Sequence, residues 1–81
     1  MSVARAALRA WILERRPGLD PAALRDDTPL LKSRVLTSLD LLELITFLER
    51  LRARPLDVEE LGPGAFHDVN AVCRNFLEEK P

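Results

Sequence analysis

Apolar residues between Val35 and Leu51 recur with the spacing of one face of an α-helix. The positions on this face are Leu41, Leu44, Ile45, Leu48 and Leu51. Thr37 and Ser38 stand just before the periodic run, where a side-chain hydroxyl can accept a hydrogen bond from a free backbone N–H. Asp40 falls in the first turn, beside the positive end of the helix dipole. The pattern predicts a helix that begins at Ser38 and buries one face.

A second group of large side chains on this helix projects away from the buried face. Its members are Leu39, Leu42 and Phe47. Leu39 is next to Ser38, and Leu42 lies one turn further along the helix. Two acids, Asp40 and Glu43, stand among them. We expect a small apolar surface to flank the hydroxyl, which is typical of a docking surface.

Two further segments show helical periodicity. A first helix is expected from about Val3 to Arg16, capped by Ser2, and a last helix after a cap at Asp68. The inward positions are Ala4, Ala7, Leu8, Trp11 and Ile12 in the first, and Val69, Val72, Cys73, Phe76 and Leu77 in the last. Residues 57–61 are expected to form one helical turn. Strand-favouring residues are scarce, so the fold class is all-α.

The connection between the first two helices, residues 17–37, is unusually long for a structureless loop. Leu30 and Leu31 are therefore expected to be tucked under the helices. Three acids lie in this connection: Asp20, Asp26 and Asp27. Their spacing does not match the ligands of a calcium loop, and it favours turn formation instead.

The composition is that of a small folded domain without an excess of either charge. The chain has 81 residues, twelve basic and thirteen acidic, with a net charge of −1. No strong field attracts nucleic acid or an anionic membrane, and no apolar run approaches the roughly 20 residues that span a bilayer. The single cysteine, Cys73, cannot form an internal disulfide. We expect one domain over residues 1–81, monomeric and cytoplasmic.

The sequence contains no catalytic or metal-binding pattern. His67 is the only histidine, and no third member of a Ser38–His67 relay is evident. There is no zinc spacing and no glycine-rich phosphate loop. Cys73 belongs to an apolar stripe, which favours a buried thiol over a reactive one. We expect no enzyme activity and no metal site.

The residues around Ser38 resemble the attachment region of acyl carrier proteins. The matching positions are Leu36-Thr37-Ser38-Leu39-Asp40, then Leu42-Glu43-Leu44 and Leu48-Glu49. In that family an Asp-Ser-Leu triplet opens the second helix, and the serine oxygen takes a 4′-phosphopantetheine arm from coenzyme A. Residues 55–60, Pro-Leu-Asp-x-Glu-Glu, are similar to the family's short third helix. The resemblance implies a small four-helix bundle, with three main helices, a short third helix and a long first loop.

The resemblance also implies a function, which is carriage rather than catalysis. Ser38 would hold an acyl intermediate as a thioester on 4′-phosphopantetheine and present it to polyketide or specialised fatty acyl enzymes. The implied partners are a phosphopantetheinyl transferase and the acyltransferases, ligases or synthases that load and use the arm. Leu39 and Leu42 are expected to anchor these partners, while Asp40 and Glu43 steer basic ones.

The chain departs from the family pattern in three places. Thr37 stands where an Asp is usual, and that acid helps the transferase hold its metal ion and coenzyme A. Val35 stands where a Gly is common. The tail of the helix carries Arg50, Arg52 and Arg54 where many members are acidic. Partners that select an acidic helix are therefore expected to bind this chain poorly.

Two alternatives stay open on the sequence. A free-standing aminoacyl or peptidyl carrier protein shares the architecture, and the Gly-Pro-Gly-Ala-Phe stretch at 62–66 is somewhat similar to such carriers. A helical interaction module without an arm would use Ser38 only as a helix cap, because serine is common at that position.

Overall fold

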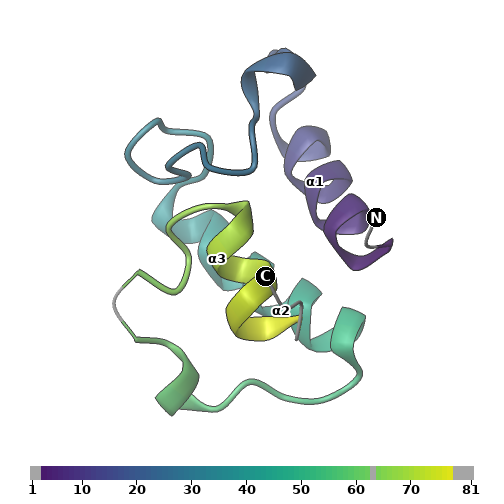
Figure 1. The fold of residues 1–81 in the computed structure, drawn as a ribbon, viewed down its shortest axis with the longest axis vertical. Helices are drawn as coiled ribbons and strands as arrows, with labels where there is room; N and C mark the ends of the chain where they lie inside the picture. The colour runs from purple at the N-terminus through teal and green to yellow at the C-terminus, as the bar shows by residue number, and fades with distance from the viewer. Residues whose placement is uncertain (1–2, 63, 78–81) are drawn as a thin grey trace.

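The computed structural model describes residues 3–62 and 64–77, and these form an all-α fold, as expected. Its three α-helices are α1 (Val3–Arg15), α2 (Ser38–Arg52) and α3 (Val69–Phe76) (Figure 1). Two single-turn 3₁₀ helices, η1 (Pro21–Ala23) and η2 (Val58–Glu60), stand in the connections. η2 takes the place where a short third helix was expected. Ser2, the expected cap of α1, lies outside the described residues, as does Pro63.

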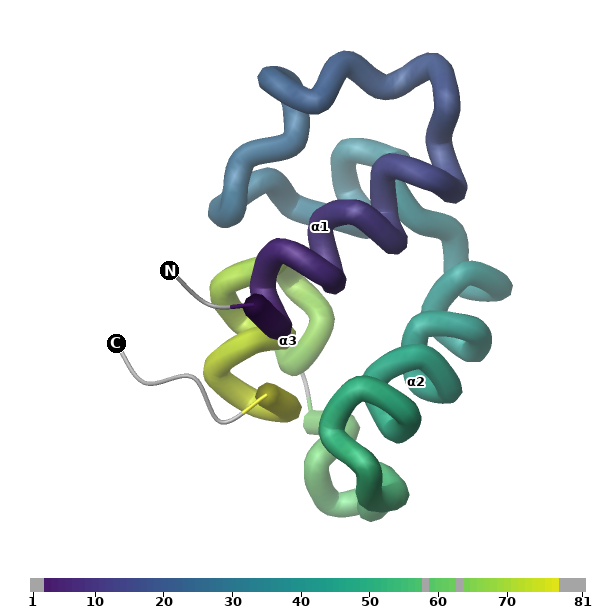
Figure 2. The backbone as a smooth tube through the Cα atoms, turned by 90° about the vertical axis from the view of Figure 1, so that its right-hand side faces the viewer, coloured from purple at the N-terminus to yellow at the C-terminus, as the bar shows by residue number. Residues whose placement is uncertain are grey.

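The core lies between the three helices. α1 and α3 lie side by side, and α2 runs next to them, so that the three helices surround the core (Figure 2). The fully buried side chains from these helices are Leu8, Ile12, Leu44, Leu48, Val69, Val72, Cys73 and Phe76. These residues confirm the apolar faces that the periodicity predicted, and they place the thiol of Cys73 inside the core.

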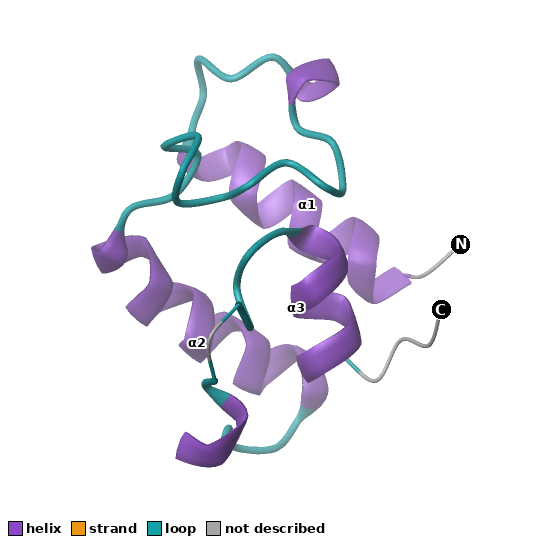
Figure 3. Cartoon of the chain, turned by 60° about the vertical axis from the view of Figure 1, so that its left-hand side comes forward, coloured by secondary structure: helices purple, strands orange, loops and turns teal. Residues whose placement is uncertain are grey.

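The connection between α1 and α2 is ordered by both apolar and backbone contacts. It covers one end of the molecule, opposite η2 (Figure 3). Its buried side chains are Leu24, Leu30, Val35 and Leu36. The backbone N–H of Leu30 donates to His67 O at 2.8 Å, and that of Asn70 donates to Asp26 O at 3.0 Å. The expectation for Leu31 was wrong, because its side chain is 44% exposed.

The C-terminal end of α2 is anchored by Arg52. Its side chain is only 8% exposed, and its guanidinium donates to the Glu60 carboxylate at 2.8 and 3.0 Å. The same group also donates to Pro55 O at 2.8 Å and Phe76 O at 3.2 Å. One side chain thus ties α2 to η2 and to the end of α3.

Phe47 corrects one expectation for the outer surface of α2. Its side chain is half-buried and packs against the core, instead of projecting away from it. Its ring stacks on Trp11 of α1, with 5.4 Å between ring centroids and 24° between ring planes. The outer group of apolar residues is therefore reduced to Leu39 and Leu42.

Candidate functional site

Ser38 is the first residue of α2, and it is exposed. The long connection ends directly before it, with Val35 and Leu36 buried in the core. These two buried residues fix the place where the chain turns into the helix. Within the described residues, the Ser38 hydroxyl makes no hydrogen bond to another protein group, so it is available to solvent.

The capping role at this helix belongs to Thr37. Its Oγ1 accepts a hydrogen bond from the backbone N–H of Asp40 at 3.3 Å. In return, the Asp40 carboxylate accepts from Thr37 N at 2.8 Å and from Thr37 Oγ1 at 3.0 Å. This reciprocal arrangement is a capping box. The helix end is thus satisfied without the hydroxyl of Ser38.

Both acids of the site are paired with arginines of α1 or its end. Asp40 forms an ion pair with Arg16, and Glu43 forms one with Arg15. The backbone N–H of Thr37 lowers the pKa of Asp40 most, partial burial acts against this, and Arg16 lowers the pKa further. Asp40 is therefore a stable anion whose charge is already matched within the chain.

Two leucines beside Ser38 remain in contact with water. Leu39 is 76% exposed and Leu42 is 64% exposed, as the pattern predicted. They lie three residues apart on α2, and are therefore neighbours on one helix face. Burying a leucine side chain would contribute about 1.5–3 kcal/mol to stability, and most of this contribution is missing for two leucines that stay exposed. These leucines stabilise the folded chain little and remain free to contact a partner.

A groove continues from Leu42 onto α1. Its lining residues are Trp11, Arg15, Leu42, Glu43, Thr46, Phe47 and Arg50. The guanidinium of Arg15 lies over the Trp11 ring, 4.6 Å from its centroid, while also pairing with Glu43. Sequence reasoning missed Trp11 and Arg15 as part of this surface. The signal available was only that Trp11 belonged to the inward face of its helix.

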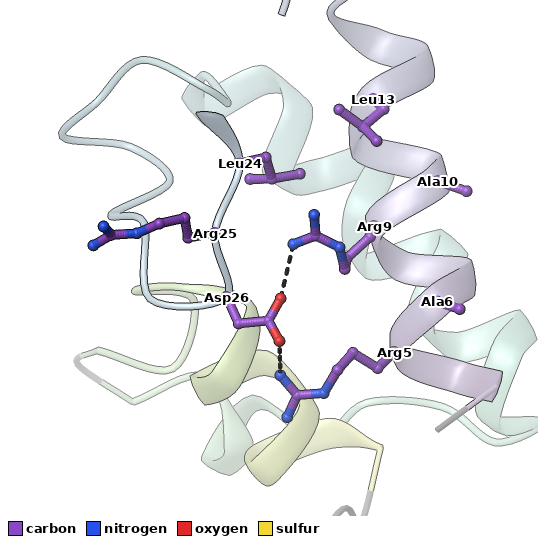
Figure 4. A pocket seen from close by; sticks show the side chains of 8 residues that line it. All are labelled: Arg5, Ala6, Arg9, Ala10, Leu13, Leu24, Arg25 and Asp26. Carbon is purple, nitrogen blue, oxygen red and sulfur yellow. Dashed lines mark hydrogen bonds and ion pairs between the residues drawn. The ribbon is translucent and has the colours of Figure 1, made fainter. Parts of the chain in front are cut away.

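A second groove, between α1 and the connection, is crossed by an ionic clamp (Figure 4). Arg5 and Arg9 both point toward Asp26, and each places an Nη1 atom 2.7 Å from one of its carboxylate oxygens. Arg5 Nη1 also donates to Asn70 Oδ1 at 2.6 Å. Asp26 was predicted only as a turn former. Its observed contacts fasten the connection to α1 and α3.

His67 lies on the surface, next to the cap of α3. Its Nε2 is 3.9 Å from the carboxylate of Asp68, and its side chain is 56% exposed. No hydrogen bond joins His67 to Ser38 in the described part of the chain. The residues that the structure describes contain no cluster of three or more His, Cys, Asp or Glu side chains that could hold a metal ion.

Comparisons with protein-family models, with curated proteins and with solved structures found no match to this chain. Among the described helices, none has the length and apolar character required to cross a membrane. The longest of them, α2, has 15 residues, with Asp40, Glu43 and Arg50 among them. The geometry at the start of α2 is therefore the main guide to function.

Proposed function

We propose that this chain is a carrier protein, with 4′-phosphopantetheine attached to Ser38. The observation that carries the proposal is the exposed hydroxyl at the first residue of α2, which the capping box leaves unused. A serine that serves as a helix cap directs its oxygen to a backbone N–H of the first turn. Here Thr37 performs that role. This division of roles favours an attachment site over a helical module in which Ser38 is only a cap.

The arrangement of elements supports the same proposal. A long connection, held by the Arg5–Asp26–Arg9 clamp and by buried leucines, delivers Ser38 to the surface. η2 lies in the stretch where the resemblance to acyl carrier proteins implies a short third helix. We propose that the three α-helices and η2 correspond to the four-helix bundle of that family.

The proposed mechanism is tethering. In the priming step, the Ser38 hydroxyl gives its proton to a base, and its oxygen forms a bond to the phosphorus next to the pantetheine of coenzyme A. The phosphoanhydride bond breaks, and the nucleotide bisphosphate leaves. The transferase supplies this chemistry. The thiol of the arm then holds an acyl group as a thioester, and the flexible tether raises the concentration of that group at each partner enzyme.

The cargo we propose is an acyl intermediate of a polyketide or specialised fatty acyl pathway, delivered by an acyltransferase, ligase or synthase. Leu39 and Leu42 would be the apolar contacts of these partners, with Asp40 and Glu43 beside them. The exposed apolar surface is small. A small surface suits a carrier, because weak contacts allow it to leave each partner.

The test is to incubate the full chain with a phosphopantetheinyl transferase, Mg²⁺ and coenzyme A, and to measure its intact mass. We expect the mass of one phosphopantetheine group to be added. Ser38→Ala should abolish the addition, and Ser33→Ala, at an exposed serine of the preceding connection, should leave it intact. An unchanged mass with several transferases, or modification of Ser38→Ala, would reject the proposal.

A further inference from the structure

The groove between α1 and α2 combines a rigid aromatic wall with an exposed leucine. Trp11 and Phe47 are stacked and half-buried, so their positions are fixed by the core. Leu42 also lines the groove, and its side chain is 64% exposed. The groove is open to solvent and has a volume of about 520 Å³, enough room for an apolar side chain of another molecule. Fixed aromatic residues in a concave surface, with charged residues around them, are typical of the centre of a protein interface.

Of the charged residues that the structure describes around this groove, the acids are paired within the chain, whereas one arginine is not. Arg15 and Glu43 form an ion pair with each other, and nearby Asp40 is paired with Arg16. Arg50 lines the groove one helical turn beyond Phe47, is exposed, and forms no ion pair within the described residues. The acids of this surface are thus matched by the chain's own arginines. The positive charge of Arg50 is therefore the one that remains for a partner to pair with.

We infer that this groove docks a partner segment that places an apolar side chain between Leu42 and the Trp11–Phe47 pair and a carboxylate against Arg50. The partner is therefore acidic at the contact, the opposite of the basic partner that Asp40 and Glu43 alone would attract. A basic partner would meet two carboxylates whose charges Arg15 and Arg16 already balance. An acidic partner meets Arg50 without breaking any of these contacts.

This inference rests on the proposed function only in assuming that the partner must reach Ser38, which begins the same helix. The contact itself does not require the arm. It can therefore be measured on the unmodified chain, and on Ser38→Ala, separately from any test of priming.

Trp11 is the single tryptophan of the chain and lines the groove, so its fluorescence reports occupancy directly. We would titrate the full chain with two tryptophan-free amphipathic peptides of about 15 residues, a length of roughly four helical turns. The peptides share one leucine face and differ only in their flanking residues, which are all Glu in one and all Lys in the other. We expect the Glu peptide to bind about fivefold more tightly, or better.

Substitutions of Arg50 give the sharper test. Arg50→Glu should reverse the preference, and Arg50→Gln should remove it without adding a new charge. Arg74→Glu makes the same change at an exposed residue of α3 outside this groove, and should leave the preference unchanged. Leu42→Ala should weaken both peptides.

Three results would overturn the docking inference: no binding of either peptide, a preference for the Lys peptide, or an equal preference in the wild type and Arg50→Glu. Failure of priming would give a different set of results. In that case the mass of the chain would stay unchanged with coenzyme A, while the preference for the Glu peptide would persist in the wild type and in Ser38→Ala.

Discussion

At its C-terminal end α2 is tied to η2 and α3 through the guanidinium of Arg52, whereas at its N-terminal end it exposes a hydroxyl and two leucines. The first end uses a nearly buried charged side chain to join three segments. The second satisfies its own backbone through the Thr37–Asp40 capping box and leaves Ser38, Leu39 and Leu42 facing water. Both ends of α2 are therefore held by ion pairs, but only the N-terminal end presents an exposed hydroxyl and two exposed leucines.

The largest expected effect is a loss of stability, and it should differ between a buried and an exposed leucine in the N-terminal half of α2. Leu44→Ala should lower the free energy of unfolding by about 2–5 kcal/mol, because it leaves a cavity where the side chain is fully buried. Leu42→Ala, two residues earlier, should change the free energy of unfolding by no more than about 0.5 kcal/mol. Urea denaturation followed by circular dichroism measures both values. Similar losses would mean that Leu42 stabilises the fold.

The second prediction concerns the anchored end. Arg52→Ala should lower the free energy of unfolding by about 2–3 kcal/mol, because Glu60 and the carbonyls of Pro55 and Phe76 lose a donor. Arg50→Ala is the matched control, since Arg50 lies in the same helix turn but is exposed. We expect it to stay within about 0.5 kcal/mol of the wild type. If the two variants were equally stable, the C-terminal end would not be anchored by Arg52.

The contrast between Arg50 and Arg52 also shows how much of the fold could be predicted from the sequence. Periodicity and capping rules depend on near neighbours along the chain, and they placed α2, the cap at Asp68 and the exposed Leu39 correctly. The sequence pattern did not distinguish Arg52 from Arg50, because both were simply basic residues in the tail of the predicted helix. Only folding brings Glu60 and Phe76 to Arg52, so its role as an anchor could not be read from the pattern.

The candidate site was predicted in part for the same reason. The position of Ser38 at the start of a helix followed from local spacing, as did the outward direction of Leu39 and Leu42. The pairing of Glu43 with Arg15 joins two residues that lie 28 positions apart in the chain, on different helices, and no local rule indicates it. The half-buried position of Phe47 depends likewise on Trp11 of α1.

The third prediction separates the capping residue from the attachment residue. Thr37→Ala should lower the free energy of unfolding by about 1 kcal/mol, because the N–H of Asp40 loses its acceptor. Ser38→Ala should change the free energy of unfolding by no more than about 0.5 kcal/mol, since alanine suits the first helical turn. Thermal unfolding of both variants provides the measurement.

Thr37→Asp extends this third prediction to priming. Aspartate keeps an acceptor for the N–H of Asp40, but it cannot donate to the Asp40 carboxylate as Thr37 Oγ1 does, so the free energy of unfolding should fall by up to about 1 kcal/mol. It also restores the acid that is usual in carrier proteins, so a generic transferase should modify the variant faster. Equal rates would show that the acid is not required at this position. A loss of stability in Ser38→Ala greater than that in Thr37→Ala would instead assign the cap to Ser38.

The smallest expected effect is a pH dependence at the anchored end. The hydrogen bond from Arg52, together with the backbone N–H of Asp57, lowers the pKa of Glu60 to about 2 from its usual 4.5. The folded chain therefore holds this carboxylate ionised at a pH where the unfolded chain binds a proton. Its contribution to stability is complete above pH 4.5 and is lost as the pH falls from 4.5 toward 2.

Glu60→Gln tests this dependence, because it keeps the shape of the side chain and removes its charge. We expect the variant to be less stable than the wild type at pH 7, with the difference shrinking as the pH falls toward 2. Urea midpoints at a series of pH values give the comparison. Glu59→Gln, at the exposed neighbouring position, leaves the bond to Arg52 intact and should keep the wild-type pH profile. A difference for Glu60→Gln that stays constant with pH would mean that ionisation of Glu60 does not contribute to holding this end of α2.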